Sequence, residues 1–248
     1  MSSKPTFVLV PGNFLPPAYY ASTVKLLESH GFQTRLIVIP STGSKLPLIS
    51  NEPDVLAICQ VLEELSNSGR DIIVVAHSYG SIPTCEAAEG FKHQERLKLG
   101  KSGGIVRLVF VAAWLLQEAE SPPSIIERYK MEASWVRFEG GNLFADDPVS
   151  ALHNDTSENL AAYWSSYTTH SDLTAFATPL KYAAWRHIST TYLVCEMDKC
   201  ILPHVQRGMV ASAKGAVKTV QLPSGHMPML SMPEKFVDIL RGEAGEDL

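Results

Sequence analysis

The chain has 248 residues, with 21 lysines and arginines against 26 aspartates and glutamates, which gives a net charge of −5. This balance argues against nucleic acid as a partner, because nucleic-acid binding depends on clustered positive charge. With 45% hydrophobic and 19% charged residues, the composition excludes a disordered protein and is typical of a chain that buries a large core. A single domain of this length is common among α/β proteins.

No apolar run approaches the roughly 18 residues that a membrane span requires. Residues 1–12 contain one lysine and an apolar run that is too short for a signal peptide. Four cysteines are too few for a disulfide framework in a chain of this length. We therefore expect a cytoplasmic protein with reduced cysteines and no membrane span.

Short apolar runs alternate with helical patterns along the first half of the chain. A run rich in Val, Ile, Leu or Phe that ends at Gly, Pro or a polar residue is typical of a strand buried on both faces of a parallel sheet. The expected strands are Phe7–Val10, Arg35–Ile39, Ile72–Ala76 and Val106–Ala113, and the expected helices are Tyr19–His30 and Asp54–Ser68. This alternation predicts an α/β fold with a mostly parallel central sheet flanked by helices.

The alternation pauses between about residues 117 and 182. No strand is predicted there, but aromatic residues are concentrated in this segment and prolines interrupt it. We expect a mostly helical insertion that caps the sheet within a single domain. The sheet pattern then resumes, with strands at Thr190–Cys195 and Val217–Leu222 and helices at Pro203–Ala213 and Pro233–Arg241.

The strand Ile72–Ala76 leads directly into Ala76-His77-Ser78-Tyr79-Gly80, which a helical pattern follows. A serine between small residues on a sharp turn from strand to helix is a nucleophile elbow, which exposes the hydroxyl at the carboxyl edge of the sheet. Ala76 stands where a glycine is usual and adds one methyl group. The side chain of His77 is expected to point away from the site.

A serine hydroxyl is a weak nucleophile until a base removes its proton and a carboxylate orients that base. His226 follows the strand Val217–Leu222, and Asp198 follows the strand Thr190–Cys195, so both are predicted at the same sheet edge as Ser78. Glu196, Glu118 and Glu120 are the alternative acids. The remaining histidines share no spacing and are expected on the surface or in packing; they are His30, His93, His153, His170, His187 and His204.

The loop after the first strand, Val10-Pro11-Gly12-Asn13-Phe14, is the second candidate segment. Gly12 permits a close approach of the backbone to a substrate, and the N–H groups of Asn13 and Tyr79 are predicted to form an oxyanion hole. Neither Gly12 nor Gly103-Gly104 has the spacing of a dinucleotide or phosphate loop. No His/Cys pairing has zinc spacing, so we predict no cofactor and no metal.

Five segments in this order resemble those of the α/β-hydrolase superfamily, over about residues 6–240. They are Phe7–Gly12, Ala76–Gly80, Leu108–Ala113, Tyr192–Asp198 and Ser224–Met227. The chain is most similar to the branch that holds plant methylesterases and hydroxynitrile lyases, and to fungal and bacterial hydrolases. The resemblance implies a helical cap, Ser78 as nucleophile, His226 as base and Asp198 as orienting acid. Plant members usually carry histidine where this chain has Pro11, so no plant substrate is transferred.

These residues predict a serine hydrolase that cleaves an ester, lactone or thioester of a largely apolar small molecule through an acyl-enzyme. The residues expected to contact this substrate are Gly12, Phe14, Trp135, Trp164 and Met227. One alternative is a lyase with the same triad, which Lys199 beside Asp198 keeps open. Another is a ligand-binding protein without turnover, as among plant hormone receptors. No partner besides the small molecule is predicted, and a homodimer is compatible with the sequence, which does not determine the oligomeric state.

Overall fold

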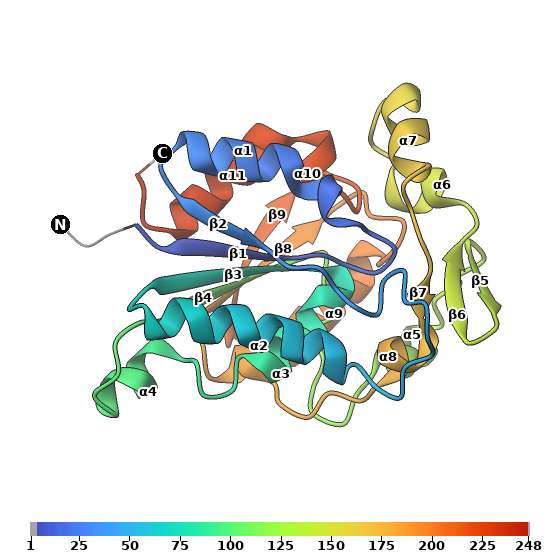
Figure 1. The fold of residues 1–248 in the computed structure, drawn as a ribbon. Helices are drawn as coiled ribbons and strands as arrows, with labels where there is room; N and C mark the ends of the chain where they lie inside the picture. The colour runs from blue at the N-terminus through green and yellow to red at the C-terminus, as the bar shows by residue number, and fades with distance from the viewer. Residues whose placement is uncertain (1–3, 248) are drawn as a thin grey trace.

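The computed structural model describes residues 4–247. Met1–Ser3, part of the segment considered above for a signal peptide, and Leu248 lie outside the described residues. Six strands form a central sheet in the order β2-β1-β3-β4-β8-β9, and each neighbouring pair is parallel (Figure 1). The strands are β1 (Thr6–Val10), β2 (Gln33–Leu36), β3 (Asp71–His77), β4 (Gly104–Val111), β8 (Thr190–Cys195) and β9 (Val217–Leu222). The predicted α/β fold is confirmed.

Helices cover both faces of this sheet (Figure 1). One face carries α1 (Ala21–Ser29), α10 (Pro228–Ser231) and α11 (Pro233–Glu243), and the other carries α2 (Glu52–Asn67), α3 (Ser81–Ala87) and α9 (Pro203–Ser212). The remaining short elements of the core are α4 (His93–Lys98) and the 3₁₀ turns η1 (Pro17–Tyr20), η2 (Ser78–Gly80) and η3 (Ala184–Arg186). None of the helices between residues 4 and 247 is long and apolar enough to cross a bilayer.

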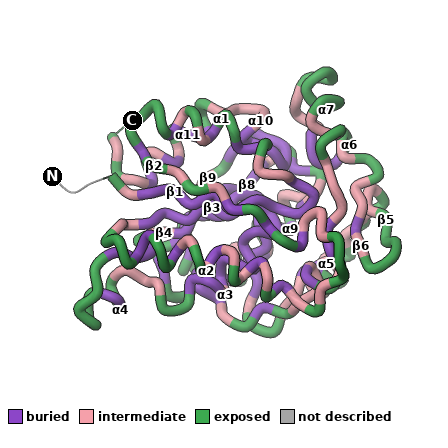
Figure 2. The backbone as a smooth tube through the Cα atoms, in the orientation of Figure 1, coloured by how far each residue is buried: buried purple, intermediate pink, exposed green. Residues whose placement is uncertain are grey.

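The hydrophobic core forms two layers, one on each face of the sheet. Successive side chains of a strand point to opposite faces, so β1 contributes to both layers. Val8 and Val10 pack in the layer that includes residues of α2 and α9, whereas Phe7 and Leu9 pack in the layer that includes residues of α1 and α11. The inner strands β1, β3, β4 and β8 are therefore buried on both sides over most of their length, which fixes the positions of the loops at their carboxyl ends (Figure 2).

The insertion between β4 and β8 forms a cap at the end of the sheet opposite the described chain ends (Figure 1). It contains the helices α5 (Pro122–Tyr129), α6 (Pro148–Leu152), α7 (Glu158–Ser165) and α8 (Leu173–Ala177). It also contains a small antiparallel sheet that the sequence analysis did not predict, of β5 (Val136–Glu139), β6 (Asn142–Ala145) and β7 (Ser171–Asp172). Gly140 and Gly141 join β5 to β6 with φ of 58° and 80°, the positive values that a type I′ hairpin turn requires.

Candidate active site

Ser78 lies at the sharp turn between β3 and α3. Its φ is 52°, in the left-handed region that L-residues rarely occupy. The surrounding residues must be small, because a Cβ added to Gly80 would lie 2.4 Å from the main-chain oxygen of Pro11 and one added to Gly12 would lie 2.8 Å from Cβ of Ser78. The strand, turn and helix therefore have the arrangement of a nucleophile elbow.

His226 and Asp198 lie on the loops that follow β9 and β8, which are neighbours in the sheet. Nδ1 of His226 is 2.8 Å from Oδ2 of Asp198, and both side chains are buried. A carboxylate only accepts hydrogen bonds, so Nδ1 carries the proton and donates it. The second ring nitrogen, Nε2, is left with a lone pair that can act as a base.

The Asp198 carboxylate is fixed by further donors. Oδ1 accepts hydrogen bonds from the N–H groups of Cys200 (2.7 Å) and Ile201 (3.0 Å), and Oδ2 accepts one from Nε2 of Gln206 (2.8 Å). Burial by itself lowers the pKa of His226, but the charge and hydrogen bond of Asp198, with a contribution from Cys200, outweigh it. The pKa of His226 is consequently raised well above its ordinary value.

The three alternative acids are engaged elsewhere. Glu196 pairs with Arg207, and Glu120 pairs with Arg128. Glu118 accepts a hydrogen bond from the N–H of Ala183 at 3.3 Å. Asp198 is therefore the acidic side chain that the fold brings to His226.

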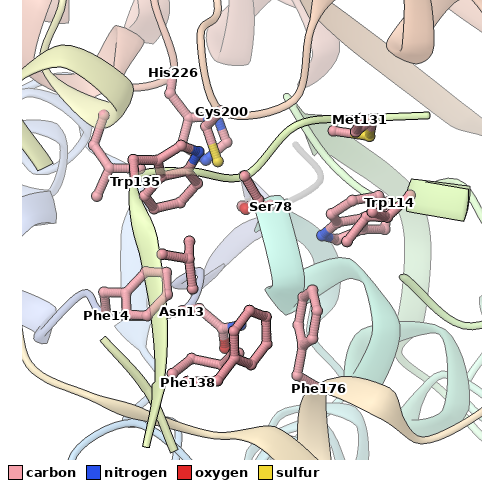
Figure 3. Close-up of a pocket in the computed structure, with 15 residues that line it drawn as sticks. Asn13, Phe14, Ser78, Trp114, Met131, Trp135, Phe138, Phe176, Cys200 and His226 are labelled. Carbon is pink, nitrogen blue, oxygen red and sulfur yellow. The ribbon is translucent and has the colours of Figure 1, made fainter. Parts of the chain in front are cut away.

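Ser78 and His226 line one cavity beneath the cap (Figure 3). No hydrogen bond joins their side chains within residues 4–247, and such distances commonly close only when substrate binds. The polar lining residues are Asn13, Ser78, Cys200 and His226; the remaining walls are apolar and include Phe14, Trp114, Met131, Trp135, Phe138, Leu143 and Phe176. The polar groups of the cavity are thus confined to the vicinity of the serine and the histidine.

The loop after β1 carries Asn13 and Phe14, which both line this cavity. The N–H of Phe14 donates to Oγ of Ser171 in β7 at 2.9 Å, which ties the loop to the cap. Tyr79, the other residue predicted at the oxyanion hole, is the middle residue of the turn η2. Its side chain points into the core, where its hydroxyl donates to Oδ2 of Asp54 at 2.6 Å. The group of Tyr79 that remains a candidate donor for the oxyanion hole is therefore its main-chain N–H.

The family of this chain follows from its similarity to known proteins. The model of the alpha/beta hydrolase family matches residues 7–239. The chain belongs to this family. An alpha/beta hydrolase of Aspergillus novofumigatus is 33% identical over 246 residues, which is 98% of each chain. Methylesterase 9 of Arabidopsis thaliana is 24% identical, and the alignment covers 94% of this chain and 96% of the methylesterase.

Solved structures confirm the fold. The crystal structure of polyneuridine aldehyde esterase superimposes with a TM-score of 0.78 at 18% identity, covering 97% of this chain and 99% of the esterase. The resemblance drawn from the five sequence segments is confirmed by the family match and by the methylesterase relative. This chain is a hydrolase of the α/β family, with esterases among its relatives.

Three residues expected to contact substrate in this hydrolase lie outside the cavity. Trp164 packs on Tyr19, with ring centroids 4.6 Å apart, because α7 lies on the outer side of the cap (Figure 1). Met227 is fully buried in the core layer of α11, since the chain turns into α10 directly after His226. Gly12 lies behind Ser78, where its lack of a side chain gives the serine room. Phe14 and Trp135 line the cavity.

His77 does not line the cavity, yet it contacts the candidate base. Its Nε2 donates to the main-chain oxygen of His226 at 2.9 Å, and the two rings lie 4.6 Å apart. Burial, reinforced by the positive charge of His226, holds the pKa of His77 well below its ordinary value, so it stays neutral. The expected direction away from the cavity is correct, but the contact joins residues 149 positions apart and leaves no local signal in the sequence.

Sequence reasoning also missed two residues that follow Asp198. Cys200 lines the cavity beside His226 (Figure 3), and Gln206 orients the Asp198 carboxylate. Lys199, which kept the lyase alternative open, is exposed and borders a surface groove with His153 and Glu158 instead of the cavity. Among residues 4–247, no group of three or more His, Cys, Asp or Glu side chains is placed to hold a metal ion.

Proposed function

We propose that this protein is a serine hydrolase that cleaves an ester, lactone or thioester of a largely apolar small molecule, with Ser78, His226 and Asp198 as its catalytic triad. One observation carries the proposal. Ser78, on a strained turn, shares a cavity with His226, whose other ring nitrogen is 2.8 Å from Asp198. A nucleophile, a base and an oriented carboxylate in this arrangement have the roles of a triad.

In the first half-reaction, Oγ of Ser78 attacks the carbonyl carbon of the substrate while its proton passes to Nε2 of His226. The carbonyl oxygen becomes an oxyanion, which the N–H groups of Asn13 and Tyr79 stabilise. Asp198 stabilises the resulting imidazolium. When the tetrahedral intermediate collapses, the bond to the leaving oxygen or sulfur breaks, and that atom takes the proton from His226. An acyl group then remains on Ser78.

In the second half-reaction, a water molecule attacks the acyl carbonyl and gives a proton to His226. The same N–H groups stabilise the second oxyanion. Collapse breaks the bond to Oγ of Ser78, which recovers its proton from His226, and the carboxylic acid leaves. Serine, imidazole and carboxylate are restored, so one water is consumed for each bond cleaved.

The cavity lining supports an apolar substrate. Residues such as Trp114, Phe138 and Phe176 offer hydrocarbon and aromatic surface and no charge. A charged group buried there would lose its hydration without gaining a partner. The proposed substrate is therefore neutral away from the carbonyl that reacts.

The test is labelling with a fluorophosphonate probe, which reacts with activated serines, run in parallel with a panel of acyl esters, lactones and thioesters. We expect the wild type to be labelled and to hydrolyse members of this panel with multiple turnovers. Ser78→Ala should abolish both. Removal of a triad nucleophile typically costs on the order of 10⁶-fold in kcat.

Ser212→Ala is a matched control, because Ser212 lies on α9 and does not line the cavity. Its hydroxyl donates to the main-chain oxygen of Met209 and accepts from Nε2 of Gln117. This variant should keep full labelling and turnover. A folded wild type that is not labelled, or a Ser78→Ala variant that hydrolyses the panel at the wild-type rate, would overturn the proposal. Stoichiometric binding without turnover would favour a ligand-binding protein instead.

A further inference from the structure

The segment of the cap between α6 and α7 reaches both catalytic loops. Nδ2 of Asn154 donates to the main-chain oxygen of Met197, in the loop that carries Asp198, at 2.9 Å. Oδ2 of Asp155 accepts a hydrogen bond from the N–H of Gly225, which precedes His226, at 2.6 Å. The cap is therefore bonded to the loops of the acid and of the base, and not only placed above the substrate cavity.

The hydrogen bond of Asp155 completes a set that fixes the backbone around His226. The oxygen of Ser224 accepts from the N–H of Met197 at 2.8 Å, and the oxygen of His226 accepts from Nε2 of His77 at 2.9 Å. Both of these partners, Met197 and His77, lie outside the cap. The cap holds this loop through the N–H of Gly225, which donates to Asp155. Asp155 therefore links the position of the cap to that of His226.

Gly225 fits against the cap because it has no side chain. An added Cβ would lie 2.5 Å from Oδ1 of Asp155 and 2.6 Å from Oδ1 of Asn154. The φ of Gly225 is not positive, so space rather than backbone conformation accounts for the glycine here. Loop and cap are thus in direct contact at this point, with no room for a shifted loop.

The segment is also anchored on its other side. His153 is buried, its ring stacks on Tyr19 with centroids 5.8 Å apart, and its main-chain oxygen accepts from Oγ1 of Thr156. Tyr19 belongs to η1, which follows the oxyanion loop. His153 therefore packs on the core two residues before Asp155. This packing holds Asp155 in place for its hydrogen bond to Gly225.

We propose that Asp155 is a positioning residue for His226: by holding the Gly225 N–H, it aims Nε2 of the imidazole at Ser78 when the cap is seated. This inference rests on the proposed function, in which His226 is the base. It gives the cap a second role besides lining the cavity.

The test compares Asp155→Ala, which removes the acceptor, with Asp155→Asn, whose amide oxygen can still accept from Gly225. A small acetate ester is the substrate, because it makes little contact with the cap. We expect Asp155→Ala to lower kcat by about 10- to 100-fold with KM changed less than about twofold, since small misplacements of catalytic groups have effects of this size. Asp155→Asn should recover most of kcat.

Asp147→Ala is the matched control. Asp147 is also a cap aspartate and accepts from the N–H of Ser150 at the start of α6, so its loss weakens the cap without touching the loop of His226. It should leave kcat unchanged. Equal losses of kcat in Asp147→Ala and Asp155→Ala, or a loss confined to KM, would overturn the positioning role, as would an Asp155→Asn variant as slow as Asp155→Ala.

A measurement that needs no turnover separates this proposal from the proposed function. Amide hydrogen exchange in the peptide that contains residues 222–227 should be faster in Asp155→Ala than in the wild type and in Asp147→Ala. If the wild type hydrolyses nothing but this exchange difference is found, the proposed function fails and the hold of Asp155 on the loop stands. If the wild type is active and exchange and kcat are both unchanged in Asp155→Ala, the positioning role fails alone.

Asp155→Ser provides for the case in which Asp155→Ala does not fold. Its hydroxyl is polar but shorter than the carboxylate by about one bond length, so it does not reach Gly225 in the same way. The expected result is the same reduction in kcat and the same faster exchange. A folded Asp155→Ser variant with wild-type kcat and wild-type exchange would overturn the proposal.

Discussion

The carboxyl edge of the sheet and the cap build one cavity by different means. At the sheet edge, Ser78, Asp198 and His226 are buried and are held by backbone geometry and hydrogen bonds. In the cap, residues such as Trp135 and Phe138 line the cavity through apolar contact, and 62% of Phe138 is exposed. A small displacement of a side chain at the sheet edge would break its hydrogen bonds, whereas the apolar lining of the cap tolerates changes in shape. In the proposed function, the chemistry therefore belongs to the sheet edge and the choice of substrate to the cap.

The largest effect is expected at the sheet edge, from Asp198→Asn. An asparagine amide can donate to Nδ1 of His226 and so favours the tautomer with a proton on Nε2, which cannot act as a base. We expect kcat to fall on the order of 10⁴-fold with KM little changed, as measured by steady-state kinetics. Glu196→Gln, which changes the acid that pairs with Arg207, should keep wild-type kcat; if it does not, the choice of Asp198 is wrong.

A smaller and selective effect is expected in the cap, from Phe138→Ala. The ring contacts the cavity but is largely exposed, so its loss should lower kcat/KM about tenfold for esters with a bulky aromatic acyl group, equivalent to about 1.4 kcal/mol of binding. Acetate esters should be unaffected, because they do not reach the ring. Tyr163→Ala, at an exposed position outside the cavity, serves as the control. Equal losses for acetate and aromatic esters would contradict the division between sheet edge and cap.

The smallest effect is a dependence of kcat/KM and of stability on pH, which arises from the His226–Asp198 pair at the sheet edge. Burial lowers the pKa of His226, but the charge and hydrogen bond of Asp198 outweigh burial, so this pKa lies well above its ordinary value of 6.5. We expect kcat/KM to rise with pH through this pKa. For stability the sign is reversed: the contribution of the His226–Asp198 pair is fully present below the unfolded pKa and is lost as pH rises through the folded pKa.

Activity and stability should therefore change in opposite directions over the same pH range. The measurements are pH–rate profiles and urea unfolding at matched pH values. Phe138→Ala should show the wild-type profile in both, because it leaves the pair intact. A stability that rises through the range in which activity rises would contradict the assignment.

The sequence predicts the sheet edge well because its signals are local. The apolar runs Phe7–Val10 and Ile72–Ala76 predict buried strands, and small residues around Ser78 predict the elbow. His226 and Asp198 follow from the rule that the carboxyl ends of parallel strands meet at one edge. Two predicted strands are shifted along the chain. The strand β4 is Gly104–Val111, whereas the sequence predicts Val106–Ala113. The strand β2 is Gln33–Leu36, and the predicted residues Ile37 and Ile39 follow the strand and pack in the core.

The cap is predicted less completely because its contacts join distant residues. The hairpin at Gly140-Gly141 carries a turn signal, but charged residues such as Arg137 and Glu139 obscure the strand pattern beside it. Aromatic composition cannot distinguish Trp135, which lines the cavity, from Trp164, which packs on Tyr19. The hydrogen bond between Asp155 and Gly225 joins residues 70 positions apart, and no sequence motif predicts it.

The cap is inserted between β4 and β8, which pair directly in the sheet. Its two ends lie side by side, because the N–H of Ala119 donates to the oxygen of Leu180 and the N–H of Leu180 donates to the oxygen of Glu120. The entropic cost of closing a chain between fixed ends grows only slowly with its length. Such an insert can be lengthened, shortened or replaced over evolution, or grafted from a relative, while the strands keep their register. On the proposed role of Asp155, a transplanted cap would still need to place a hydrogen-bond acceptor beside the N–H of Gly225, where Oδ2 of Asp155 lies in this chain.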